Sequence, residues 1–382
     1  MNEHSTEDLA LWAEVDLGCI RRNVSRIKGR LTPGTALLAV VKANGYGHGE
    51  VEAARAAIDG GADWLGVARA QEGAALRGAG IDRPILLLAQ PPLSALAAAA
   101  DYGLTPTIYT EEAARAWAAL ATGGHPLGCH VKVDTGMHRY GVACERAEEF
   151  LDLLRGLPGL RVEGIWTHFA VAEEVANSFT SQQHKLFREL LDSLGPKADG
   201  LIRHMSNSAG ALTLPEAHLD LVRTGIATYG IYPSPALAPT VELEPAMSLK
   251  SRVGLVKRLA AGEAISYGQR YTLRRDGLVA TIPCGYADGL RRSLGNHGEV
   301  LIRGRRYRIS GTVTMDHFLV DAGDDEVKIG DEVVILGRQG DDRITAQEMA
   351  DKLGTIPYEV VCGISARVPR IYLNRQPGPG GS

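Results

Sequence analysis

The sequence predicts an α/β fold: a (β/α)8 barrel of the TIM type followed by a mostly β C-terminal domain. Up to residue 243, short apolar runs alternate with helical segments that are rich in alanine and leucine. From residue 244 on, glycine and β-branched residues become frequent, and helical periodicity persists only around residues 345–353. Strands that alternate with helices of about 10–15 residues indicate parallel βα units, and eight such units favour a closed barrel.

The barrel strands are expected where the chain is short, apolar and bounded by helical segments. In chain order they cover residues 37–42, 64–68, 84–89, 105–109, 129–134, 162–168, 201–206 and 219–224. The clearest helical segments between them cover residues 50–61, 111–122 and 181–194. We therefore expect residues 1–243 to form the barrel domain. The alternative that the first residues pack on the C-terminal domain stays open.

The second domain is expected over residues 244–375, as strands joined in hairpins. Its strand-like segments cover residues 247–259, 277–287, 297–314 and 331–338. The proline-rich stretch at 232–240 is typical of a linker between the domains. The tail at 376–382 has the composition of a disordered segment.

Composition excludes several classes of protein. The chain has 382 residues and a formal charge of −4, which argues against a nucleic-acid-binding protein, and the basic run at 303–308 is typical of a solvated strand face. Its five cysteines have no CxxC spacing, which disfavours a disulfide framework or a zinc site and indicates a reducing compartment. The first residues lack the pattern of a signal peptide, and no apolar run approaches the 18 residues of a membrane span. We therefore expect a cytoplasmic protein that binds no metal and no membrane.

Lys42 is the most informative residue, because it ends a buried strand. The apolar run from Leu37 to Val41 leads directly into it, and Gly45 and Gly47 follow within the AVVKANGYGHG segment. A cation at the end of an interior strand is costly unless the protein uses it. The commonest use is covalent, since a desolvated lysine amine forms a Schiff base with a carbonyl compound.

The other strand ends also carry polar groups, where the active site of a barrel lies. Lys132 and Asp134 lie on the fifth strand, His168 ends the sixth, and Arg223 lies near the end of the eighth. A single buried histidine is more often a satisfied core residue than a site residue. The convergence of several strand ends favours a site.

The loops after the last two strands are typical of a phosphate site in such barrels. Asn207 and Ser208 stand at a predicted helix start, and Gly225 and Ile226 are expected to present free backbone N–H groups to a phosphate. Plain N-capping by Asn207 or Ser208 is the alternative for the first pair. Together with a lysine that forms a Schiff base, the pattern favours a phosphorylated aldehyde, pyridoxal 5′-phosphate (PLP).

At this point the chain resembles the alanine racemase family, the barrel class of PLP enzymes, over nearly its whole length. Eight motifs carry the resemblance in order: AVVKANGYGHG (39–49), VKVDTGMHRYG (131–141), THFA (167–170), RTGIATYG (223–230), SYGQRY (266–271), GYADG (285–289), TMD (314–316) and TIPYE (355–359). The resemblance implies a homodimer with shared active sites and an amino acid as substrate.

The resemblance also implies roles for individual residues. Lys42 would hold PLP and serve as one catalytic base, and Tyr267 of the partner subunit would serve as the other. Met315, also supplied by the partner, would contact the substrate through its backbone. Arg139 would face the substrate carboxylate. Two bases suit racemisation, because a proton leaves one face of the α-carbon and returns to the other.

The cofactor is expected to touch four further residues by the same resemblance. Tyr46 and Tyr358 would contact its phosphate, and Tyr358 would also narrow the pocket. His168 would hydrogen-bond Arg223, which would lie at the pyridine nitrogen. Since an arginine cannot give up its proton to the ring, we expect the ring to stay unprotonated and transamination to be suppressed.

Lys132 has two interpretations. In the family this lysine is often carbamylated and orients the arginine that corresponds to Arg139. The alternative is an ion pair between Lys132 and Asp134.

The resemblance places a substrate access corridor at four residues: Glu173, Tyr286, Arg292 and Ile356. The chain departs from the family pattern at Thr312, Glu173, Trp166 and Thr224. Trp166 stands where a tyrosine or a smaller residue is usual.

The function expected from the resemblance is interconversion of L- and D-alanine, which supplies D-alanine for peptidoglycan. A racemase for serine or for a broader set of amino acids is the first alternative. A PLP-homeostasis protein is disfavoured, because such proteins lack a β domain. A barrel-type decarboxylase is disfavoured because its glycine-rich phosphate loop is missing here.

Overall fold

The structure is a computed structural model that describes residues 6–376, and the chain divides into two compact units. One, the barrel unit, comprises Cys19–Gly45 and Glu50–Glu244. The other, the β unit, comprises the chain up to Gly18, the short segment Tyr46–Gly49 and the chain from Pro245 on. Residues 377–382 of the predicted disordered tail lie outside the described residues.

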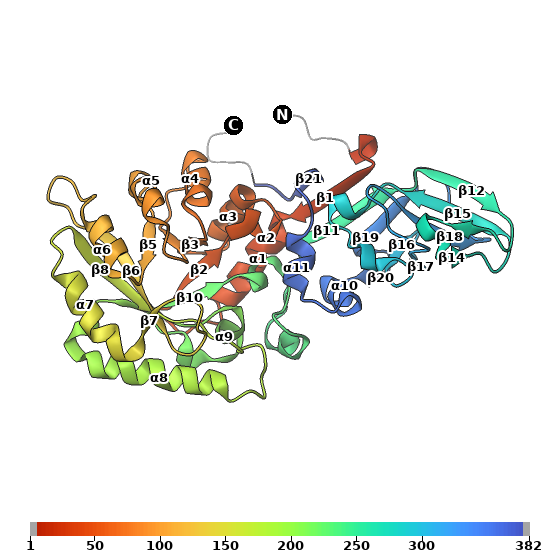
Figure 1. The fold of residues 1–382 in the computed structure, drawn as a ribbon. Coiled ribbons are helices and arrows are strands. Elements are labelled where there is room, and N and C mark those ends of the chain that lie inside the picture. The colour runs from red at the N-terminus through yellow and green to blue at the C-terminus, as the bar shows by residue number, and fades with distance from the viewer. Residues whose placement is uncertain (1–5, 377–382) are drawn as a thin grey trace. The chain divides into compact units, whose positions relative to one another are not determined.

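Eight parallel strands form the barrel in the order β10-β2-β3-β4-β5-β6-β8-β9 (Figure 1). Their bounds are β2 (Ala36–Val40), β3 (Trp64–Val67), β4 (Ile85–Leu87), β5 (Thr105–Ile108), β6 (Leu127–Asp134), β8 (Leu160–Trp166), β9 (Ile202–His204) and β10 (Leu221–Thr224). The short β7 (Val142–Ala143) pairs with the end of β6. Next to β9 and β10, the N–H of Arg223 donates to Ser206 O at 3.0 Å and brings the barrel close to closure.

Helices cover the outside of these strands in Figure 1. They are α1 (Leu17–Lys28), α3 (Glu50–Asp59), α4 (Ala70–Gly78), α5 (Leu96–Asp101), α6 (Glu111–Ala118), α7 (Ala147–Arg155), α8 (Phe179–Leu194) and α9 (Ser208–Thr213). The short segment α2 (Lys42–Tyr46) is a left-handed turn after β2 rather than a regular helix. Thr110 Oγ1 caps the start of α6 by accepting from the N–H of Ala113, and α6 buries Trp117 against the strands.

The β unit contains a mixed sheet in the order β17-β16-β19-β11-β1-β21, with β20 paired to β19. The strands are β1 (Leu11–Asp16), β11 (Met247–Arg252), β16 (Glu299–Ile302), β17 (Arg305–Arg308), β19 (Glu332–Gln339), β20 (Asp342–Ile344) and β21 (Arg370–Leu373). The first strand of the chain, β1, lies between β11, to which it is antiparallel, and β21, to which it is parallel.

Two smaller sheets and two helices complete the β unit. The sheets are β12 (Leu255–Leu259), β15 (Gly277–Ile282) and β18 (Phe318–Gly323), and the pair β13 (Ala264–Ile265) and β14 (Tyr271–Thr272). The helices are α10 (Ala346–Leu353) and α11 (Pro357–Cys362). Thr345 caps the start of α10 and Gly354, at φ 65°, ends it. The predicted fold class, a (β/α)8 barrel with a mostly β domain, is confirmed.

Candidate active site

The predicted polar residues of the barrel unit lie at the carboxyl ends of its strands. Lys42 follows β2, Lys132 lies within β6, His168 follows β8, Ser208 follows β9 and Arg223 lies within β10. Because parallel strands share the direction of their ends, these side chains belong to one end of the barrel.

Lys42 begins a turn whose backbone is left-handed. Ala43 and Asn44 both have φ of 54°, Gly45 has φ of 60° and Tyr46 has φ of 52°. Each non-glycine residue in this conformation costs about 1–2 kcal/mol, so other contacts must hold the turn. Such strain is typical of functional sites.

Glu72, in the first turn of α4, is one of those contacts. Its Oε1 accepts from the N–H of Ala43 at 2.7 Å, and its Oε2 accepts from the N–H groups of Ala68 and Arg69 at 2.8 and 3.0 Å. One carboxylate therefore joins the residue after Lys42 to the start of α4. On the other side of the turn, Asn44 Oδ1 accepts from the N–H of Glu50 at 3.1 Å.

Arg223 is buried and surrounded by neutral acceptors. Its guanidinium bonds His204 Nδ1 at 2.8 Å, His168 Nδ1 at 3.2 Å, and the carbonyl oxygens of Thr167 and Met205 at 2.9 and 3.1 Å. Burial lowers the pKa of Arg223 to about 9. No carboxylate among residues 6–376 forms an ion pair with it.

The direction of these bonds fixes the imidazole tautomers. A guanidinium only donates, so both histidines accept through Nδ1 and carry their proton on Nε2. His204 Nε2 then donates to His130 Nδ1 at 2.9 Å. Burial, and next the charge of Arg223, lower the pKa of both His168 and His204 well below the ordinary value, so both stay neutral. The predicted bond between His168 and Arg223 is present.

Lys132 is buried without a counter-ion among the described residues. Burial lowers the pKa of its amine to about 8, and the charges of Arg139 and Arg223 add to the effect. Asp134 serves the turn that follows β6: its Oδ1 accepts from the N–H groups of Gly136 and His138 at 2.9 and 3.0 Å. The alternative of a Lys132–Asp134 ion pair is therefore wrong.

The expected phosphate loops are already bonded to each other. Asn207 Oδ1 caps α9 by accepting from the N–H of Gly210 at 3.0 Å, as the capping alternative required. Ser208 Oγ accepts from the N–H of Gly225 at 2.9 Å. The expectation that Gly225 presents a free N–H is wrong in this structure, because the serine hydroxyl occupies it. Ile226, which starts a short 3-10 turn, is fully buried.

The predicted site residues of the β unit fall into two groups. Tyr46 and Tyr358 lie together with ring centroids 6.1 Å apart, and burial followed by the neighbouring Tyr358 raises the pKa of Tyr46. Four other side chains, in contrast, are exposed although they are large and apolar. These are Tyr267 (74 % exposed), Met315 (54 %), Ile356 (58 %) and Tyr286 (44 %).

Thr312 fixes the backbone beside Tyr267. Its Oγ1 donates to Tyr267 O at 2.8 Å, and Ser266 Oγ donates to Thr312 O at 2.6 Å. The threonine that departs from the family pattern therefore supports the SYGQRY segment. Of the remaining predicted residues, Arg139 and Arg292 are exposed, and Glu173 is half-buried with its carbonyl oxygen accepting from Ser234 Oγ.

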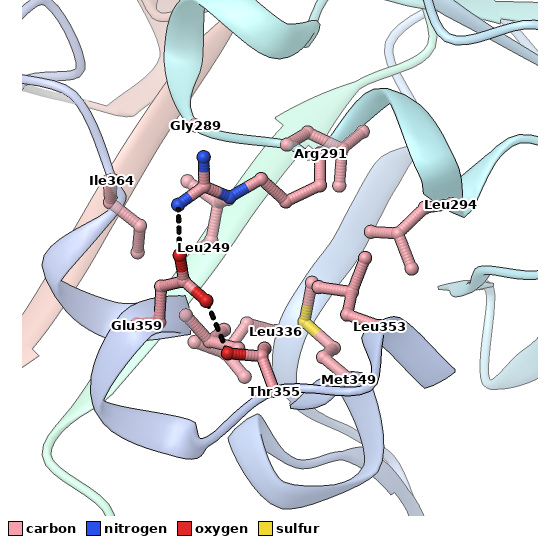
Figure 2. A pocket seen from close by; sticks show the side chains of 12 residues that line it. Leu249, Gly289, Arg291, Leu294, Leu336, Met349, Leu353, Thr355, Glu359 and Ile364 are labelled. Atoms are coloured by element: carbon pink, nitrogen blue, oxygen red, sulfur yellow. Dashed lines mark hydrogen bonds and ion pairs between the residues drawn. The ribbon is translucent and has the colours of Figure 1, made fainter. Parts of the chain in front are cut away.

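A pocket in the β unit is distinct from these residues. Figure 2 shows its mostly apolar lining from β11, β19, α10, α11 and the Gly289–Leu294 segment, with one ion pair between Arg291 and Glu359 at 3.3 Å. None of the predicted site residues lines it. It is a gap in side-chain packing that carries no set of groups suited to catalysis.

Sequence reasoning missed three residues of the barrel site: Glu72, His130 and His204. His204 had a signal, since it lies within the strand predicted at residues 201–206. Glu72 and His130 had none, because their partners lie 29 and 74 residues away along the chain.

The described residues include neither a candidate metal cluster nor a helix that could cross a membrane. Among residues 6–376, no three His, Cys, Asp or Glu side chains are placed to hold a metal ion. Over the same residues, every helix is too short or too polar to cross a membrane.

Comparison with known proteins gives the family. The family model described as alanine racemase, N-terminal domain, matches residues 15–233, and that of the C-terminal domain matches residues 246–372. The alanine racemase of Symbiobacterium thermophilum is 48 % identical over 369 residues, which are 94 % of this chain and 96 % of the relative. Alanine racemase 1 of Bacillus subtilis is 42 % identical over 95 % of this chain and 92 % of its own length.

Solved structures of alanine racemases are also similar to this chain. The alanine racemase of Bacillus anthracis with bound L-Ala-P has a TM-score of 0.89 and 39 % identity over 96 % of this chain and 95 % of that chain. The alanine racemase of Streptomyces coelicolor has a TM-score of 0.88 and 38 % identity over 97 % of this chain and 99 % of that chain. The relatives and the structures cover nearly the whole length on both sides, so the chain belongs to the alanine racemase family, as its motifs predicted.

Proposed function

We propose that this enzyme interconverts L- and D-alanine with the help of PLP. The observation that carries the proposal is a group of cationic side chains at one end of the barrel. Arg223 bonds His168 Nδ1 at 3.2 Å, and Lys132 Nζ and Arg223 Cζ each lie 4.6 Å from the centroid of the Trp166 ring. After burial, the charges of Arg223, Lys132, Arg139 and Lys42 lower the pKa of His168. No carboxylate among residues 6–376 forms an ion pair with Lys132, Arg139 or Arg223. Such a set of donors fits anionic ligands, namely a phosphate-bearing cofactor and an amino-acid carboxylate.

The residues of the barrel unit fit PLP. Lys42 would hold the aldehyde through its amine, and Arg223 would meet the pyridine nitrogen. Ser208, Asn207 and Ile226 would hold the phosphate, with Tyr46 and Tyr358 assigned to it from the family pattern, whereas the Gly225 N–H already donates to Ser208 Oγ. When bound, the cofactor withdraws electrons from the α-carbon and so acidifies its proton. Arg223 would remain a donor towards the ring nitrogen, because neutral histidines and carbonyl oxygens accept its other N–H groups.

Two groups of the protein would exchange the α-proton. We propose that the Lys42 amine serves one face and the Tyr267 hydroxyl of a second copy serves the other. The exposure of Tyr267 and Met315 supports this assignment, since large exposed apolar side chains suit a surface that another molecule covers. Glu173, Tyr286, Arg292 and Ile356 are proposed to line the corridor to the shared site.

Lys132 is proposed to carry a carbamate. Its neutral amine would add to CO2 with loss of one proton, which forms an N–C bond and an anion next to Arg139. The lowered pKa of Lys132, about 8, supports this because a larger fraction of the amine is then neutral near pH 7. The anion would offset the surrounding positive charge and orient Arg139 towards the substrate carboxylate.

Alanine is the proposed substrate because Tyr358 would narrow the pocket around the substrate side chain. One extra hydroxyl or methylene discriminates by only about 1–3 kcal/mol, so slow turnover of serine is compatible with the proposal. D-alanine made in the cytoplasm would supply peptidoglycan synthesis.

One experiment tests the proposed function. The purified chain is loaded with PLP and incubated in D2O with L-alanine or L-serine, and chirality, α-deuteration and CO2 release are followed. Inversion of alanine without CO2 release is the expected result. Faster inversion of serine would favour a broader racemase, and the absence of exchange with every amino acid would refute the proposal.

A further inference from the structure

Trp166 lies at the centre of the cationic group. It is the last residue of β8 and is 2 % exposed. The Lys132 Nζ lies 4.6 Å from the centroid of its ring, and the Arg223 Cζ also lies 4.6 Å from that centroid. Lys132 Nζ and Arg223 Cζ are therefore separated by at most twice 4.6 Å. Both lie within the range in which a cation is attracted by an aromatic ring.

The same ring contacts the two imidazoles that bond Arg223. His204 stacks on it with centroids 5.5 Å apart and an interplanar angle of 10°, and His168 meets it edge-on at 6.5 Å and 84°. Trp166 therefore packs against Arg223 and against both of its imidazole acceptors.

The indole N–H contributes nothing to these contacts. Trp166 Nε1 is buried and has no hydrogen-bond partner among residues 6–376. A buried donor without a partner is unfavourable, so hydrogen bonding does not explain a tryptophan here. What the residue offers is the face of its ring, whose negative quadrupole attracts cations.

Two cations in contact with the same ring and without a carboxylate repel each other, and the ring face reduces this cost. We propose that Trp166 is a positioning residue that holds the Arg223 guanidinium at the end of the barrel, and that, before the Lys132 amine takes up CO2, its ring also holds the Lys132 ammonium and favours the charged form of that amine. The effect of Trp166 on kcat rests on the proposed function. The effect of Trp166 on the protonation of Lys132 is independent of the proposed function.

Other groups also act on Lys132, and the test must separate them from the ring. Arg139, Arg223 and Lys42 oppose its charge, and Asp134 favours it. The Tyr140 ring lies 5.8 Å from Nζ, and neutral His168 lies against the same tryptophan. All of these groups remain in place when only Trp166 is changed.

The first arm of the test is fluorescence of the full chain without PLP, in CO2-free buffer. Subtracting the emission of Trp166→Phe from that of the unchanged chain isolates Trp166 from the other tryptophans. We expect this emission to titrate with a midpoint at about pH 8 as Lys132 loses its proton, and Lys132→Met to abolish the transition. A flat titration, or one that persists in Lys132→Met, would overturn the proposal.

The second arm compares Trp166→Phe with Trp166→Leu in the loaded enzyme. Phenylalanine keeps an aromatic face and lacks only the unpaired N–H, whereas leucine keeps apolar bulk alone. The leucine variant is expected to lose roughly 2- to 30-fold more kcat than the phenylalanine variant, which is the range expected for loss of the cation–π contact between the ring and Arg223. Equal losses in the two variants would contradict a role for the ring face. Thermal unfolding of both variants checks that they fold.

The two arms separate this proposal from the proposed function. If the loaded chain does not racemise alanine but the Trp166 titration depends on Lys132, only the proposed function fails. If the chain racemises alanine and the titration is flat, the positioning role fails.

Discussion

Removal of the Glu72 carboxylate is expected to loosen the turn that follows Lys42. The Ala43 N–H loses its acceptor at 2.7 Å, while Ala68 and Arg69 lose theirs at the start of α4. A hydrogen bond to a charged group contributes about 1.5–3 kcal/mol. About 1.4 kcal/mol corresponds to a tenfold change in the equilibrium constant for local opening. Glu72→Ala should therefore accelerate hydrogen exchange at the Ala43 amide by about 10- to 150-fold.

Hydrogen exchange measured by NMR or by mass spectrometry of the peptide around Lys42 is the assay. Glu112→Ala is the matched control, because Glu112 stands in the first turn of α6, where it is exposed and makes no contact with the turn. Glu72→Gln should give an intermediate rate, since its amide retains one accepting oxygen. Unchanged exchange at Ala43 in Glu72→Ala would refute the idea that this carboxylate holds the strained turn.

Three further predictions concern charge and catalysis. The pKa of Lys132 is about 8 in the folded chain against an ordinary 10.5, so burial of its ammonium destabilises the fold below about pH 8, and this penalty disappears as the pH rises towards 10.5. In CO2-free buffer, Lys132→Met should therefore raise the free energy of unfolding more at pH 7 than at pH 10.5. An equal gain at both pH values would contradict the account. Tyr267→Phe should slow conversion of L- to D-alanine by about 10²–10⁴-fold with little change in PLP binding, measured by chiral chromatography and cofactor titration, and a comparable loss of both would rule out a role as base. Arg223→Glu should let the ring nitrogen take a proton and so increase transamination, detected as pyruvate; transamination as rare as in the unchanged enzyme would count against the role given to the arginine.

The barrel was predictable because each strand is a short apolar run between helical segments. The expected strand at 64–68, for example, became β3 (Trp64–Val67), and that at 219–224 became β10 (Leu221–Thr224). The carboxyl ends of parallel strands all lie at one end of a barrel, where the active site is expected. Lys42 and Arg223 could therefore be assigned to the site before any contact was known. Periodicity and topology suffice for this level of detail.

Side-chain partners could not be predicted in the same way. The bond between His204 and His130 depends on the stagger of two strands that are 74 residues apart, and no local pattern encodes it. The Ser208–Gly225 bond likewise joins two loops that were each expected to face a phosphate. A prediction from each loop alone leaves the Gly225 N–H free, whereas in the folded chain it donates to Ser208 Oγ.

Trp166 illustrates a third limit. The sequence marked it as unusual for the family, but only the folded chain shows that Lys132 and Arg223 both lie over its ring. Burial of a large aromatic side chain at the end of a strand is ordinary in a core. Its significance comes from the charges around it, which arrive from β6 and β10.

The central claim is that Lys42 holds the cofactor covalently. The most direct test incubates the chain with PLP, reduces the adduct with borohydride and locates the modified residue by mass spectrometry of proteolytic peptides, with Lys42→Met as control. The account predicts one phosphopyridoxyl group, on Lys42, and none in the control. Modification at another lysine, such as Lys132, or no incorporation at all would contradict it.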